Sequence, residues 1–124
     1  ATPLKRIETI PDKPVIYVLG NHEYYKGSYP KTLHKIREAA LDSNVHVLEN
    51  SFVDIDGIRF HGATLWTDFS IFGNPVQYGM LCQPKMNDYK MIRRDPSYSK
   101  MRTLDIIIKN HPRSPIQSPM VLIL

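Results

Sequence analysis

A short apolar run that ends in a Gly-Asn turn, residues 15–23 (VIYVLGNHE), most constrains what this chain can fold into. A stretch rich in Val and Ile between Pro14 and Gly20 predicts a buried strand. Ligand sites in α/β sheets lie beyond the carboxyl ends of such strands. The turn therefore presents an amide, an imidazole and a carboxylate at the position where α/β proteins usually have their active or binding sites. The alternative is a tight turn in which Gly20 and Asn21 tolerate positive φ and the next two side chains are merely solvated.

The length and composition predict one domain with a modest core. The chain has 124 residues, of which 42% are hydrophobic and 23% charged, as in ordinary globular proteins. We find no apolar run long enough to span a bilayer and no secretory signal pattern, so we expect no membrane association. Cys82 is the single cysteine, which excludes an intrachain disulfide and fits a cytoplasmic location.

The pattern of the first half predicts alternating helices and strands, and hence an α/β fold. Ser28 and Pro30 predict the start of a helix that ends near residue 42. Short strands are expected at 45–48, 52–55 and 58–64, with a hairpin at Asp56-Gly57 between the last two.

The second half contains most of the ten prolines and predicts more irregular structure. Residues 68–84, rich in Gly, Asn, Pro and aromatic side chains, are expected to form an irregular excursion. Asp95-Pro96 predicts the start of a helix that runs to about residue 110. The side chains expected on its buried face are Met101, Leu104 and Ile108.

An apolar run, Met120–Leu124, follows a segment broken by three prolines. An apolar strand must be paired inside a sheet, because otherwise it becomes a sticky edge. Three alternatives remain: the run pairs within this domain, it pairs with another copy, or the natural protein continues past it. A homo-oligomer formed through Met120–Leu124 is therefore one expected partnership.

The turn Gly20-Asn21-His22-Glu23 and the strand before it resemble the Gly-Asn-His-Asp/Glu block of the calcineurin-like metallophosphoesterases. Downstream, the helix at 30–42, the stretch Val47-Leu48-Glu49-Asn50 and residues 58–69 (IRFHGATLWTDF) are similar to the order seen in bacterial members. The resemblance implies a partial α/β sandwich of that family, with a mixed sheet and flanking helices. Residues 1–124 would then be a single partial metallophosphoesterase-like domain.

The resemblance implies a hydrolase of phosphate mono- or diesters that uses a pair of divalent ions (Mn, Fe, Zn or Mg). Carried over to this chain, Asn21 would be a metal ligand, His22 the acid or transition-state stabiliser, and Glu23 the partner that orients His22. A metal pair lowers the pKa of a bridging water and holds the attacking and leaving oxygens. A histidine that titrates near neutrality can supply the proton for the leaving group.

The family's other metal ligands have no counterpart in this sequence. An Asp-x-His pair and a Gly-Asp block would precede Pro14, but residues 1–13 contain no His. A later His would follow a strand such as 120–124, and His111 does not fill that role because Pro112 follows it. One neutral amide cannot hold a divalent ion, which needs several convergent ligands. We therefore expect weak or absent metal binding, and no efficient hydrolysis, by this chain alone.

Two other classes of function remain open. The missing ligands and the apolar terminus are also typical of a non-catalytic module that keeps a phosphatase scaffold for interaction or oligomerisation. Between Lys85 and Arg102, six basic residues stand against two acids, which accounts for the net charge of +4. This window could bind nucleic acid through charge and through stacking on Tyr89 and Tyr98, although we favour a solvated loop surface. His61 could bind a metal only with ligands from elsewhere.

Overall fold

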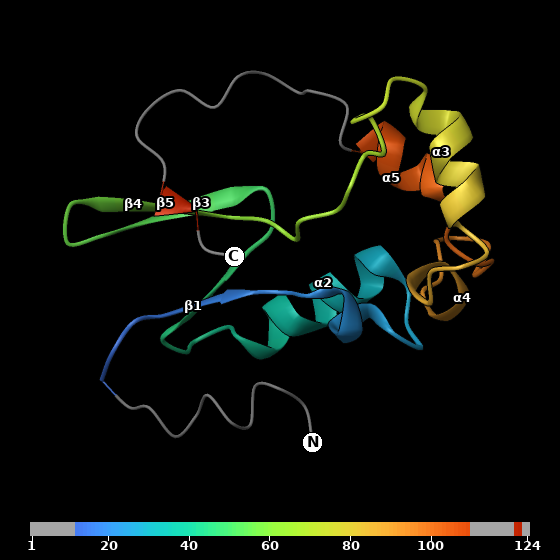
Figure 1. The fold of residues 1–124 in the computed structure, drawn as a ribbon. Helices are drawn as coiled ribbons and strands as arrows, with labels where there is room; N and C mark the ends of the chain where they lie inside the picture. Colours follow the sequence, from blue (N-terminus) through green and yellow to red (C-terminus); the bar gives the residue numbers. More distant parts are fainter. Residues whose placement is uncertain (1–11, 110–120, 123–124) are drawn as a thin grey trace.

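The computed structural model describes residues 12–109 and 121–122, which form a mixed α/β structure (Figure 1). The predicted α/β class is therefore confirmed. Expectations for residues 1–11, 110–120 and 123–124, His111 included, lie outside the described residues. In chain order the elements are β1 (Val15–Val18), η1 (Asn21–Tyr24), α2 (Tyr29–Ala39), β2 (Val45–Leu48), β3 (Ser51–Ile55), β4 (Ile58–Gly62), α3 (Pro75–Cys82), α4 (Asp88–Met91), α5 (Thr103–Lys109) and β5 (Val121–Leu122).

A parallel strand pair carries the predicted turn at its carboxyl end. β1 pairs with β2 from Val15 opposite Val45 to Val18 opposite Leu48, and α2 is the helix that connects the two strands. α2 begins after Ser28, as predicted, although the Ser28 side chain makes no capping hydrogen bond. The chain therefore leaves β1 and β2 at the same edge, where both strands deliver polar residues.

A hairpin and the C-terminal strand form the other sheet. β3 and β4 are antiparallel, and the turn between them is the predicted Asp56-Gly57, with φ of 50° and 76°. β5 runs parallel to β4, with Val121 opposite Phe60. In the described residues the C-terminal run thus pairs within its own chain, which is the first of the three alternatives. A homo-oligomer through Met120–Leu124 stays a prediction.

Gly62, at the end of β4, lies close to β1 and β2 of the other sheet. A Cβ atom at this position would lie 2.5 Å from Leu48 Cβ and 2.9 Å from Val18 Cγ2. Overpacking a filled core typically costs about 1–3 kcal/mol. We expect Gly62→Ala to lower the free energy of unfolding by about that amount in urea denaturation. Ile58→Val, at the half-exposed start of the same strand, should change it by less than about 0.5 kcal/mol. Equal effects in the two variants would contradict this close approach.

The expectation of an irregular excursion over 68–84 was wrong for Pro75–Cys82, which is helix α3. Pro75 occupies the first turn, and the Asn74 side chain caps the helix by accepting a hydrogen bond from the Gln77 N–H at 3.2 Å. Gly79 lets α3 approach α5, because a Cβ there would lie 2.8 Å from Thr103 Oγ1. A local cap and a contact with a distant segment together stabilise this helix.

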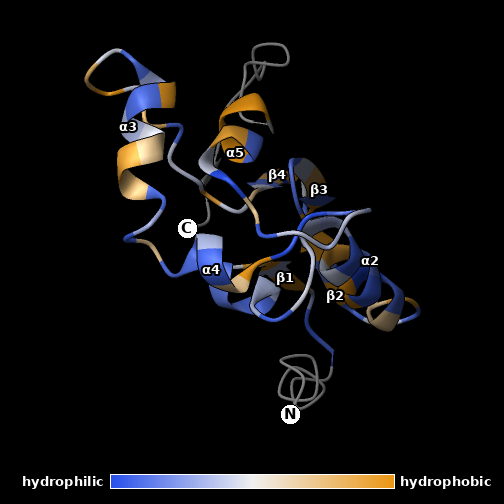
Figure 2. Cartoon of the chain, turned by 90° about the vertical axis from the view of Figure 1, so that its right-hand side faces the viewer, coloured by the Kyte–Doolittle hydropathy of each residue, from blue (hydrophilic) through white to orange (hydrophobic). Residues whose placement is uncertain are grey.

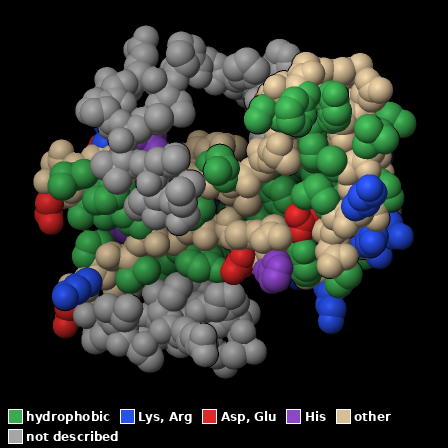
Figure 3. All heavy atoms as spheres, viewed as in Figure 1, with side chains coloured by type: hydrophobic (Ala, Val, Ile, Leu, Met, Phe, Trp, Pro, Cys, Tyr) green, Lys and Arg blue, Asp and Glu red, His purple; other side chains and the backbone are tan. Residues whose placement is uncertain are grey.

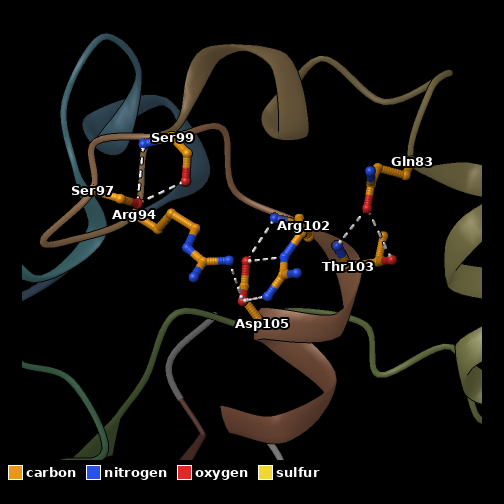
Figure 4. A network of polar contacts seen from close by, with 7 residues as sticks. All are labelled: Gln83, Arg94, Ser97, Ser99, Arg102, Thr103 and Asp105. Carbon is orange, nitrogen blue, oxygen red and sulfur yellow. Dashed lines mark hydrogen bonds and ion pairs between the residues drawn. The ribbon is translucent and has the colours of Figure 1, made fainter.

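The predicted helix start at Asp95-Pro96 was also wrong, because α5 begins at Thr103. Asp105 accepts a hydrogen bond from the Arg102 N–H at 2.9 Å and forms an ion pair with the Arg102 guanidinium at 3.0 Å. The Thr103 N–H donates to Gln83 Oε1 at 3.0 Å, as Figure 4 shows. These contacts set the start of the helix.

The buried face of α5 differs from the predicted one, because Thr103 and Ile107 lie against Gly79 of α3. Ile106 is 2% exposed, whereas Leu104 and Ile108 are 36% and 65% exposed. The prediction that those two residues are buried was therefore wrong. Met101 is buried as predicted, but it precedes the helix.

The core includes residues on both sides of the turn after β1 and leaves part of α3 uncovered. Leu19 and Tyr24, on either side of the turn, are 1% and 0% exposed. The buried cluster consists of Leu19, Tyr24, Phe69, Tyr89, Ile92, Met101 and Ile106. Figure 2 shows apolar stretches on α3, where Met80 and Leu81 remain largely exposed. None of the described helices has the length and apolar character needed to cross a lipid bilayer.

Candidate functional site

The turn after β1 is a 3-10 helix, η1, that begins at Asn21. The Gly20 N–H donates a hydrogen bond to Glu23 Oε2 at 2.8 Å, so the carboxylate closes the turn locally. His22 is exposed, and its ring lies 4.6 Å from the Tyr25 ring with a tilt of 33°. The structure thus brings Asn21, His22 and Glu23 together just beyond the carboxyl end of β1.

A pocket of about 590 Å³ lies beside this turn. Its walls include Asn21 from the turn, Trp66 and Thr67 from the segment after β4, and Met86 and Asp88 from the region of α4. Asp88 is the single charged side chain among the lining residues. Among the described residues, the pocket lining therefore carries a negative charge and no cationic side chain that could hold a phosphate.

Asp88, the first residue of α4, contacts the turn from 67 positions further along the chain. Its Oδ1 accepts a hydrogen bond from Asn21 Nδ2 at 2.8 Å and another from the Tyr25 hydroxyl at 2.6 Å. The hydrogen bond to Asp88 raises the pKa of the Tyr25 hydroxyl. No sequence motif marks Asp88, which is one of the two acids inside the basic window of residues 85–102.

A buried polar cluster joins the ends of β1, β2 and β4. Glu49, 8% exposed, accepts hydrogen bonds from the Tyr29 hydroxyl at 2.7 Å and from the Thr64 N–H at 2.9 Å. The Thr64 hydroxyl lies 2.6 Å from Glu49 Oε2 and 2.8 Å from the Leu19 carbonyl oxygen. Glu49, the residue after β2, is thereby connected through Thr64 to the backbone of Leu19, just before the turn. Glu49 fell within the stretch that resembles the phosphoesterases, but no role was predicted for it.

Three tyrosines near the site are held in their neutral form. Burial raises the pKa of Tyr17, Tyr24 and Tyr89 to about 12 each, and the negative charge of Glu23 adds to the shift at Tyr17. Tyr17 and Tyr89 line the pocket. The Tyr89 hydroxyl has no hydrogen-bond partner among the residues that the structure describes.

The basic window, residues 85–102, does not form one continuous free cationic surface. Arg94 and Arg102 both pair with Asp105, at 3.4 and 3.0 Å (Figure 4). Figure 3 shows Lys and Arg side chains on the side of the molecule where α3 and α4 lie. Tyr89, proposed above as a stacking residue, is 3% exposed and cannot stack on a base. Nucleic-acid binding by this window stays an untested prediction.

The described residues of the site supply one candidate metal ligand, which is too few to hold a metal ion. Within residues 12–109 and 121–122, no group of three His, Cys, Asp or Glu side chains is arranged to hold a metal ion. Asn21 Oδ1 is an oxygen ligand of the kind that hard cations prefer. His61, the conditional ligand, lies 5.6 Å from the Phe52 ring with its Nε2 buried. Further ligands would have to come from polypeptide outside the described residues.

One comparison with curated proteins gives a match for this chain. The chain is 29% identical over 96 residues to the uncharacterized protein L509 of Acanthamoeba polyphaga mimivirus. The match takes in 73% of this chain and 32% of the relative, so the chain spans about a third of that protein's length. No protein-family model and no solved structure gives a match. A functional assignment therefore depends on the residues of the site.

Proposed function

We propose that this chain is a segment of a metal-dependent phosphoesterase, in which Asn21 supplies one metal ligand and His22 acts on the scissile phosphate. The observation that carries the proposal is the position of both residues beyond β1, where Asn21 lines a pocket of about 590 Å³ and His22 is the exposed next residue. The resemblance of residues 20–23 and 58–69 to the calcineurin-like metallophosphoesterases supports it. We also propose that family's α/β sandwich for the complete domain.

The charge of the pocket supports a reaction that depends on metal ions. A phosphate ester is an anion, and the charged side chain that lines the pocket is the carboxylate of Asp88. Two like charges 4 Å apart repel by about 1 kcal/mol in water and by more in a partly buried site. Bound divalent cations would reverse the local charge and let the ester enter.

The residues of this chain have separate roles in the proposal. When bound, a metal pair would supply an activated water and hold the reacting oxygens. In this proposal the exposed imidazole of His22 is the general acid that donates a proton to the leaving oxygen. Glu23 orients His22 indirectly, because its bond to the Gly20 N–H fixes the turn that carries the imidazole. Asn21 presents its amide oxygen as a ligand.

Paramagnetic broadening by Mn²⁺ in NMR spectra of the whole chain tests the metal ligand. Millimolar Mn²⁺ is needed, because one ligand position gives only weak binding. We expect the signals of residues 20–23 to broaden first, because the ion would bind at Asn21. Asn21→Ala should abolish this local broadening. His22→Ala should leave it in place, since His22 is not proposed as a ligand. Broadening that persists in Asn21→Ala would refute the assignment of this residue.

Hydrolysis of bis(4-nitrophenyl) phosphate tests whether the chain is complete as an enzyme. We expect the purified chain with Mn²⁺ to show no turnover above the background of the metal alone. Stoichiometric Mn or Fe in the purified chain, together with robust turnover that His22→Ala removes, would instead show a self-sufficient phosphoesterase.

A non-catalytic interaction module is the second candidate. It is favoured by apolar side chains that are exposed on α3 and the loop before it, among them Ile71, Phe72 and Met80. Such a module would self-associate or bind a partner protein. Sedimentation velocity that shows a strictly monomeric chain at high concentration would count against self-association.

A further inference from the structure

We infer that Asp88 is a positioning residue of this site, which holds the Asn21 amide with its oxygen turned away from α4 and available to a ligand. The identity of that ligand, a divalent cation, rests on the proposed function. The orientation of the amide does not, and it can be tested without metal.

The chemistry of the two side chains fixes the orientation of the amide. The two ends of an Asn amide have similar shapes, but one end only donates hydrogen bonds and the other only accepts them. An ionised carboxylate only accepts, so the end of Asn21 that lies 2.8 Å from Asp88 Oδ1 must be the NH₂ group. Asn21 Oδ1 therefore faces away from Asp88. No residue that the structure describes donates a hydrogen bond to that oxygen.

Tyr25 links Asp88 to the other residues of the turn. Its hydroxyl donates to the same carboxylate oxygen at 2.6 Å, and its ring lies 4.6 Å from the ring of His22. Asp88 thus connects to Asn21 directly and to His22 through Tyr25. Ligands of metal ions are commonly oriented by such outer contacts, whose removal typically weakens metal affinity by about 10- to 100-fold.

α4 holds Asp88 firmly in place. Tyr89 and Ile92, which follow it, are 3% and 0% exposed and belong to the core cluster. The Lys26 N–H donates to the Met91 carbonyl at 2.9 Å, which attaches the end of α4 to the loop after the turn. The carboxylate is therefore presented from a helix that is anchored on both sides.

The NMR signals of the Asn21 side-chain amide test the orientation directly. In the unaltered chain we expect NH₂ proton signals that are shifted from those of a solvated Asn and exchange slowly with water, because the NH₂ group is hydrogen-bonded. Asp88→Ala removes the acceptor of the Asn21 hydrogen bond. Tyr25→Phe removes the other hydrogen bond to the Asp88 carboxylate, which loosens the carboxylate without changing its charge. Both should move the signals toward those of a solvated Asn. Asp56→Asn, which removes one charge at the hairpin turn, should leave them unchanged. Unchanged signals in both Asp88→Ala and Tyr25→Phe would overturn the inference.

The Mn²⁺ titration separates failure of this inference from failure of the proposed function. We expect Asp88→Ala and Tyr25→Phe to weaken Mn²⁺ binding at least about tenfold. If Asn21→Ala leaves the broadening intact, the proposed function fails whatever the amide signals show. If only Asn21→Ala affects the broadening, the positioning role fails. If Asp88→Ala weakens binding while Tyr25→Phe and the amide signals do not change, Asp88 is a direct ligand, which also overturns the positioning role.

Discussion

Raising the pH from 10 to 12 is expected to unfold this protein, mainly through Tyr24 and Tyr89. Their pKa is raised from 10.0 to about 12 by burial, and the two residues are 0% and 3% exposed. Between these pH values the unfolded chain loses protons that the folded chain keeps. The folded chain therefore keeps its full stability below pH 10 and loses stability progressively as the pH approaches 12. At about 1.4 kcal/mol per pKa unit, ionisation of the two residues costs on the order of 5 kcal/mol in total, comparable to the stability of a small domain.

The unfolding can be followed by circular dichroism, together with the absorbance of ionised tyrosine. Tyr89→Phe offers the sharpest comparison, because the Tyr89 hydroxyl has no partner in the described residues and its loss should matter little at pH 7. We expect this variant to move the midpoint of alkaline unfolding upward by several tenths of a pH unit. Tyr98→Phe, at a side chain that is 52% exposed, should leave the midpoint unchanged. A shift of equal size in both variants would show that burial of Tyr89 is not the cause.

The first half of the fold could be predicted because its determinants are local. The apolar run before Gly20, the Ser28 and Pro30 helix start, and the Asp56-Gly57 turn each specify a neighbouring element. The structure places β1, β2 and the hairpin within one or two residues of the expected bounds. Turn chemistry and alternation are enough for such segments.

The second half depends on contacts that no local pattern reveals. α3 and α5 approach each other through Gly79 and Thr103, and the Arg102–Asp105 pair fixes the start of α5. This contact with α3 buries the face of α5 that carries Thr103 and Ile107 and leaves Leu104 and Ile108 exposed, which explains the errors at those two residues. The Asn74-Pro75 cap was the one local signal that could have revealed α3.

Part of the candidate site could also be predicted from local sequence, and part of it depends on distant contacts. The turn residues Asn21, His22 and Glu23 could be placed from the strand that precedes them. Asp88 could not, because its contact with Asn21 spans 67 positions and no motif marks it. Glu49 looks like a surface acid after a short strand, yet the fold buries it against Thr64.

Glu49→Ala is expected to lower the free energy of unfolding by about 3 kcal/mol or more. The carboxylate accepts from the Tyr29 hydroxyl and the Thr64 N–H, and the Thr64 hydroxyl lies 2.6 Å away. A buried donor that loses its acceptor typically costs about 1–3 kcal/mol, and here at least two are affected. Glu49→Gln keeps one acceptor oxygen but turns an NH₂ group toward one of the donors. We therefore expect it to lower the free energy of unfolding by less than Glu49→Ala does.

Urea denaturation with Glu38→Ala as the control measures this effect. Glu38 lies on the exposed face of α2 and pairs with His34 at 3.2 Å, so its removal should cost less than about 0.5 kcal/mol. Comparable losses in Glu38→Ala and Glu49→Ala would contradict the buried network. The NMR signals of residues 20–23 extend the test to the site, because Thr64 connects Glu49 to the Leu19 carbonyl just before the turn. We expect Glu49→Gln to shift these signals while the chain stays folded, since the position of the turn depends on this network.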